Sequence, residues 1–69
     1  MKLYLENRFE EMKLIGNPVS NKEAIQMMYD FCEERSFKVY YVRSWKNKEK
    51  NMIQYDVGSH SEFFYLQED

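Results

Sequence analysis

The chain has 69 residues, of which 43% are hydrophobic and 17% are aromatic, and it carries a formal net charge of −2. This length corresponds to one domain near the lower size limit for independent folding, and two glycines and one proline are too few for a linker or a low-complexity segment. The acidic balance excludes a general polyanion binder, so a nucleic-acid site would need a local basic patch.

Residues 1–19 fit two different structures. Residues 2–5 and 12–15 have the composition of two short strands that would pair with each other, and Gly16 would end the second strand. A helix capped by Asn7 is the alternative, because four apolar residues recur at helical spacing: Leu5, Phe9, Met12 and Ile15. We favour the strands, and the helix stays open as the second interpretation.

The clearest element is a helix that begins near Asn21 and ends around Ser36. Ser20 occupies the N-cap position and Glu23 follows three residues later, which is the spacing of a capping box. Apolar residues at spacings of three and four give this helix one face for packing. They are Ala24, Ile25, Met28, Phe31 and Cys32.

From residue 37 onward the composition favours strands. Residues 37–43 are rich in β-branched and aromatic side chains and predict a strand, and the charged residues 46–51 predict a hairpin loop. A second strand is predicted over residues 52–57 and a third over residues 62–67, with turn chemistry at residues 58–61 between them. Short connections of this kind favour an antiparallel meander.

These elements together predict a single α+β domain over residues 1–69. One main helix would pack on a small antiparallel sheet, in the chain order β-(β)-α-β-β-β.

Alternation along the strands predicts which side chains share each face of the sheet. The face toward the helix would carry Val39, Tyr41, Ile53, Tyr55, Val57, Phe64 and Leu66. The opposite face would carry Tyr40, Val42, Met52, Phe63 and Tyr65. One helix covers only one face, so residues 1–19 either cover the opposite face or leave it exposed as an aromatic interaction surface.

The leading functional hypothesis is a non-enzymatic protein-binding module that uses this opposite face. Its interface residues would be Tyr40, Val42, Phe63 and Tyr65. The partner would be another protein or a second copy of the chain, since a twofold homodimer is a common way for a small domain to bury such a face.

An acidic cluster near the end of the helix would form a secondary binding surface. Asp30, Glu33 and Glu34 oppose the helix dipole, which favours cations at that end, so a basic partner would explain their placement. The alternative is an ordinary solvated helix face, with Arg35 diluting the negative charge.

The charged hairpin is the basis of a second candidate function, nucleic-acid binding. Cations that neutralise phosphates beside an indole that stacks on a base describe such a contact. The residues would be Arg43, Trp45, Lys46, Lys48 and Lys50. The alternative is a lysine-rich hairpin tip that deters edge-to-edge pairing of strands.

No catalytic, metal or cofactor site is expected. His60 lies next to serines, but sequence adjacency does not supply the fixed geometry that nucleophile activation requires. One histidine and one cysteine cannot complete a structural zinc site, and Cys32 belongs to the apolar stripe of the helix. The single cysteine, the absence of a signal-like apolar run and the lack of a membrane-spanning stretch predict a cytoplasmic location.

Residues 55–65, with residues 15–20 and the Phe31–Glu34 end of the helix, resemble small orphan proteins encoded by phages of Gram-positive bacteria. The resemblance covers about the last two-thirds of the chain. It implies an intracellular accessory protein that binds and modulates a host factor, and it assigns no functional residues.

Overall fold

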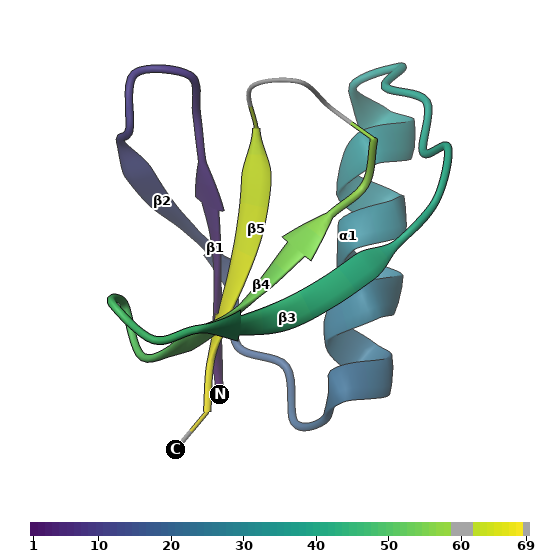
Figure 1. Ribbon diagram of the computed structural model, residues 1–69. Coiled ribbons are helices and arrows are strands. Elements are labelled where there is room, and N and C mark those ends of the chain that lie inside the picture. The colour runs from purple at the N-terminus through teal and green to yellow at the C-terminus, as the bar shows by residue number, and fades with distance from the viewer. Residues whose placement is uncertain (59–61, 69) are drawn as a thin grey trace.

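The computed structural model describes residues 1–58 and 62–68, and within them it contains one α-helix and one five-stranded antiparallel sheet (Figure 1). The predicted α+β class is therefore confirmed. The elements are β1 (Lys2–Glu6), β2 (Met12–Gly16), α1 (Asn21–Glu34), β3 (Arg43–Asn47), β4 (Met52–Asp56) and β5 (Phe63–Gln67).

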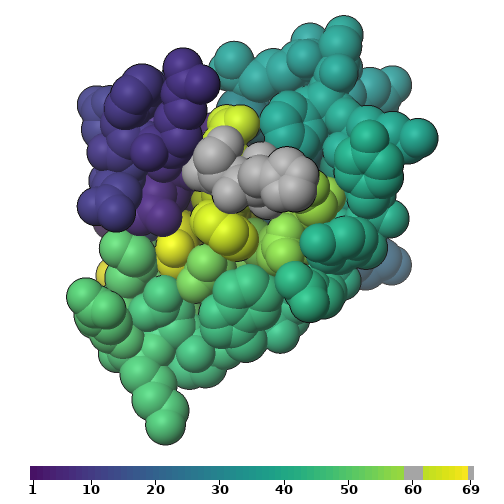
Figure 2. All heavy atoms as spheres, turned by 45° about the horizontal axis from the view of Figure 1, so that its top comes forward, coloured from purple at the N-terminus to yellow at the C-terminus, as the bar shows by residue number. Residues whose placement is uncertain are grey.

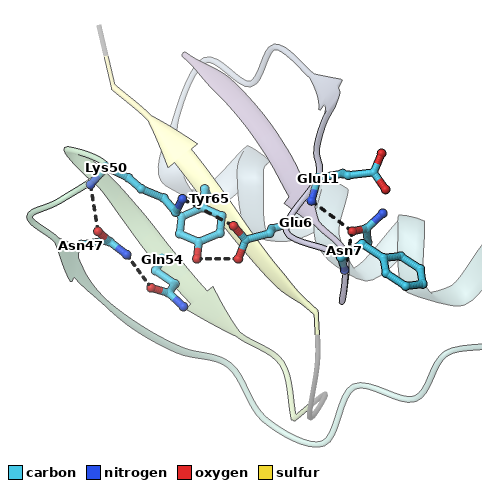
Figure 3. Close-up of polar contacts among 8 residues, drawn as sticks. Glu6, Asn7, Glu11, Asn47, Lys50, Gln54 and Tyr65 are labelled. Carbon is cyan, nitrogen blue, oxygen red and sulfur yellow. Dashed lines mark hydrogen bonds and ion pairs between the residues drawn. The ribbon is translucent and has the colours of Figure 1, made fainter.

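The N-terminal segment forms two strands, as favoured above, and not a helix. Asn7, the cap of the alternative helix, instead organises the β1–β2 turn, because its side-chain oxygen accepts the backbone N–H groups of Phe9 at 2.8 Å and Glu11 at 3.1 Å (Figure 3). Glu10 completes the turn with a φ of 63°, in the left-handed region. An asparagine can serve a turn or a helix cap equally well, so only the pairing of the flanking strands decided between them.

The N-cap of α1 is the predicted one. The Ser20 hydroxyl accepts the backbone N–H of Glu23 at 3.2 Å, which satisfies one of the unpaired donors of the first turn. The helix ends at Glu34, slightly before the predicted end, because Ser36 has a left-handed φ of 56°. The backbone N–H of Phe37 then donates to the carbonyl of Cys32 at 2.7 Å and closes the end of the helix.

The strands lie in the order β2-β1-β5-β4-β3 across the sheet, which differs from their order along the chain. The last three strands form the expected meander, but the first strand then pairs with the last, with Leu3 opposite Leu66 and Leu5 opposite Phe64. Both strands nearest the chain ends are therefore interior strands of the sheet. β2 and β3 are left as its two edges.

The predicted strand over residues 37–43 is wrong. β3 begins at Arg43 and runs through part of the predicted hairpin loop to Asn47. The β3–β4 ladder ends at Arg43 opposite Asp56. Beyond it the backbone N–H of Tyr40 donates to the Val57 carbonyl at 3.3 Å, out of the register of the ladder, and Gly58 forms a turn with a φ of 95°. The alternating apolar residues ahead of β3 therefore pack on the core but are not part of a strand. Strand propensity does not distinguish residues that pack in this way from residues that also pair.

The core lies between α1 and one face of the sheet. Its buried residues are Leu3, Ala24, Met28, Cys32, Tyr55, Val57, Phe64 and Leu66. The ring of Phe31 meets the ring of Phe64 edge-on at 5.9 Å, and the Tyr55 hydroxyl donates to the side-chain oxygen of Asn21 at the start of the helix. Most of the predicted helix-facing residues are in place, but Tyr41 is exposed because its segment is not a strand.

The opposite face is covered by the sheet itself and not by a separate layer. The β3–β4 hairpin crosses over β5 toward β1, so that Lys50 Nζ lies 3.5 Å from a carboxylate oxygen of Glu6 (Figures 1 and 3). Tyr65 lies beneath this contact and is only 3% exposed, and its hydroxyl donates to Glu6 at 3.1 Å. Within the hairpin, the side-chain amide of Asn47 on β3 donates to Gln54 on β4 at 3.0 Å.

Candidate protein-binding groove

The four residues predicted as an aromatic interface do not form one exposed patch. Tyr65 is buried under the β3–β4 hairpin, and Phe63 is half-buried with its ring 6.5 Å from that of Trp45. Val42 is half-buried against the core, whereas Tyr40 is 67% exposed. Alternation along a strand predicts the face on which a side chain lies, but not the curvature of the sheet. The twist of a small sheet lets the β3–β4 hairpin cover Tyr65 on β5.

The basic hairpin has fewer free cations than its sequence suggests. Arg43 Nη2 lies 2.7 Å from Asp56 Oδ2, and this hydrogen bond raises the pKa of Arg43 and lowers that of Asp56. Lys50 is paired with Glu6, so among the described residues Lys46 and Lys48 are the cations of the predicted set that form no ion pair. Figure 2 shows this hairpin (green) projecting from the body of the molecule.

The acidic cluster lies where the sequence placed it. Asp30, Glu33 and Glu34 are all exposed on the second half of α1. None of them forms an ion pair within residues 1–58 and 62–68, and Asp30 accepts only the Gln26 side-chain amide, at 3.0 Å. Arg35 forms no ion pair with them in the part of the chain that the structure describes, and its guanidinium lies over the ring of Phe31 at 4.2 Å.

A groove that the sequence analysis did not find runs between the edge strand β2 and α1. Its volume is about 370 Å³, and it is lined by Lys13, Leu14, Ile15, Met27, Asp30, Phe31 and Glu34. We call it the acidic groove. Its floor is apolar, and two carboxylates of the acidic cluster stand on its helix side opposite a single lysine. Gly16 allows β2 to approach the helix here, since a Cβ at that position would lie 3.1 Å from Met27 Sδ.

A smaller cavity of about 140 Å³ adjoins the groove, and the two hollows share Lys13 and Phe31 as lining residues. The other lining residues are Leu5, Cys32, Arg35, Phe37, Val57, Glu62 and Phe64. Burial raises the pKa of the Cys32 thiol, with a further contribution from Glu62, which favours the neutral thiol at physiological pH.

The two edges of the sheet differ in character. β2 exposes Met12 and Leu14, and Phe9 is exposed in the adjoining turn. β3 exposes the polar and charged side chains of Arg43, Ser44 and Lys46, together with the indole of Trp45. Charged side chains on an edge strand discourage another strand from pairing with it, and β2 has only Lys13 in that role.

Other expected features are tested only in part. His60 lies outside the described residues, so the structure says nothing about it. In the part of the chain that the structure describes, no three His, Cys, Asp or Glu side chains converge in a way that could hold a metal ion. Over the same residues, no helix is long and apolar enough to cross a membrane.

Comparison of the chain with protein-family models, with curated proteins and with solved structures found no match.

The signals for the acidic groove are present in the sequence but lie on separate elements. The apolar run Met12–Gly16 and the carboxylates of the helix end are both visible there. The fold brings the apolar run and the carboxylates together, because the strand order makes β2 an edge strand and β2 lies beside α1.

Proposed function

We propose that this chain is a small non-enzymatic protein-binding module whose contact surface is the acidic groove. The observation that carries the proposal is an apolar groove beside an open sheet edge, with carboxylates on one side that form no ion pair within residues 1–58 and 62–68. The partner is a protein with a basic, partly apolar surface segment. This moves the proposed interface from the aromatic residues of the opposite face to the helix side of the molecule.

Two physical arguments support a charged protein ligand. Glu33 and Glu34 lie at the negative end of the helix dipole, which costs a few tenths of a kcal/mol each, and a cationic partner would offset that cost. The apolar floor of the groove supplies contact area that a purely electrostatic site would lack. Nucleic acid fits this surface poorly, because its phosphates would meet carboxylates of like charge.

The test is capture of partners from a nuclease-treated lysate of a Gram-positive bacterium. The wild-type chain is expected to retain a protein band in stoichiometric amount, and the double variant Asp30→Lys, Glu34→Lys is expected to lose it. The matched control is Glu10→Lys, Glu49→Lys, which makes the same charge change in two exposed turns away from the groove. The control should retain the band.

Three results would contradict the proposal. The first is a band retained by both double variants, which would place the contact elsewhere. The second is captured material that is present without nuclease and absent after nuclease treatment. This result would favour nucleic-acid binding by the basic hairpin, and the capture should then depend on Lys46 and Lys48. The third is a stable dimer of the free chain that needs no other protein, which would favour self-association.

A further inference from the structure

We infer that the partner occupies the acidic groove as an extended, basic segment that pairs with the outer edge of β2 and becomes a sixth strand of the sheet. This inference rests on the proposed function, and it specifies the conformation and the chemistry of the occupant.

The first argument is the open edge. β2 is the terminal strand of the sheet, and within the described residues its only strand partner is β1. A terminal strand presents a row of backbone N–H and C=O groups that another chain can pair with. A helix or a loop in the same groove would leave these groups to water, whereas an added strand satisfies them.

The second argument is the contrast between the two edges. β3 carries cations at Arg43 and Lys46, whereas four of the five residues of β2 have no charge. The exposed side chain of Leu14 (48%) shows that β2 keeps apolar surface at the edge where strand addition would occur. The helix-side wall of the groove, next to this edge, bears the uncompensated carboxylates of Asp30 and Glu34.

The third argument is the alternation of side chains along an added strand. Every second side chain would point toward α1, into the acidic groove, and the others would lie over the opposite face beside Met12 and Leu14. Arginine or lysine at a groove-facing position beside Ile15 would meet Asp30 and Glu34, whereas the position beside Lys13 suits an uncharged side chain, because like charges on neighbouring strands repel. A groove-facing phenyl ring would pack on the apolar residues Ile15, Met27 and Phe31 of the groove.

The probe is a synthetic peptide with the sequence acetyl-Arg-Thr-Phe-Thr-Arg-Thr-Phe-Thr-amide, in which arginine and phenylalanine share one side of the extended chain. Binding is measured by titrating the isotope-labelled full chain and following its amide resonances by NMR. The peptide should shift and protect the amides of Met12–Gly16, and a peptide with glutamate in place of arginine should bind about tenfold more weakly or worse. The Asp30→Lys, Glu34→Lys variant should reverse this preference.

N-methylation of the peptide tests strand pairing separately from charge. In a strand, alternate residues direct their N–H groups to opposite edges, so methylating one alternate set blocks the pairing edge and methylating the other does not. One methylated peptide should therefore bind about tenfold more weakly or worse, because several hydrogen bonds are lost. The other should bind within about threefold of the parent peptide.

Each contrary outcome has a distinct meaning. Equal affinities for the two methylated peptides would overturn strand addition while leaving the acidic groove as a binding surface. Equal affinities for the arginine and glutamate peptides, or no binding of the arginine peptide at millimolar concentration, would overturn a basic extended ligand. The lysate experiment judges the proposed function independently of both, because it presupposes no peptide conformation.

Discussion

Tyr65 lies on the face of the sheet that the sequence predicts, but the folded sheet buries its side chain. Alternation places it on the face away from the helix, and it does lie there, opposite Tyr4 and Gln54. The Lys50–Glu6 contact nevertheless closes over it, and its hydroxyl is bound to Glu6. Burial first, and then this hydrogen bond, raise the pKa of Tyr65 to about 12.

The raised pKa predicts how stability depends on alkaline pH. Unfolded tyrosine ionises near its model value of 10.0, whereas folded Tyr65 keeps its proton to about 12. The unfolded chain therefore binds fewer protons between these values, and the free energy of unfolding falls as pH rises through this window. Burial also raises the pKa of Tyr55, which adds to the same trend.

The Tyr65→Phe variant tests this assignment. It should lower the free energy of unfolding at neutral pH by about 1 kcal/mol, because the Glu6 acceptor loses a buried donor, and it should flatten the fall above pH 10. Tyr4→Phe is the matched control, since the Tyr4 hydroxyl makes only an exposed 3.4 Å contact with Gln67 and should change little. Urea unfolding at several pH values measures both, and equal slopes for wild type and Tyr65→Phe would contradict the role given to Tyr65.

At the scale of the element, α1 has opposite electrostatic character at its two ends. Glu23 lies in the first turn, where a negative charge is favourable. The last turn contains no basic residue, and it carries Glu33 and Glu34 instead. The helix therefore forms through its N-cap and its apolar stripe despite the charges at its end.

This arrangement predicts a substitution that stabilises the protein while weakening its binding. Glu34→Lys should raise the free energy of unfolding by about 0.5 kcal/mol at low salt, because it places a cation at the negative end of the dipole. It should at the same time weaken binding at the acidic groove, which Glu34 lines.

Glu23→Lys makes the same charge change at the other end of the helix. It should lower stability and leave binding unchanged, since Glu23 does not line the groove. Urea unfolding and lysate capture give the two readouts. A loss of both stability and binding in Glu34→Lys would indicate a structural role for that carboxylate.

At the scale of the whole molecule, the strand order determines which leucines are structural and which are available for contact. Leu3 lies on the interior strand β1 and is fully buried between the sheet and the helix. Leu14 lies on the edge strand β2, and its side chain is about half exposed beside the groove. In sequence, the two leucines lie in similar short apolar runs.

Truncation of these two leucines should therefore have very different effects. Leu3→Ala should cost about 2–5 kcal/mol, which is a large part of the stability of so small a domain. Leu14→Ala should cost less than about 1 kcal/mol, because little apolar surface leaves the interior. Urea unfolding measures both changes, and similar costs would contradict the placement of β2 at the edge of the sheet.

The local features were predictable because they depend on residues close together in the chain. The Ser20 cap, the apolar stripe of α1 and the strands around residues 52–56 and 63–67 follow from spacing and composition. The segment before Arg43 was not predictable in this way, because its alternating residues suit a paired strand and a packed segment equally well, and the ladder that separates the two ends at Arg43 opposite Asp56.

The sequence by itself determined an α+β domain with one capped helix, antiparallel strands and an acidic helix end. Only the tertiary structure decided that β1 pairs with β5, that the β3–β4 hairpin covers Tyr65, and that β2 stands beside α1 as an open edge. The physical reason is the separation along the chain over which each kind of interaction acts. Helix caps and side-chain periodicity act over a few residues, whereas strand order and sheet curvature are set by contacts between distant parts of the chain, such as Glu6 with Lys50 and Leu3 with Leu66.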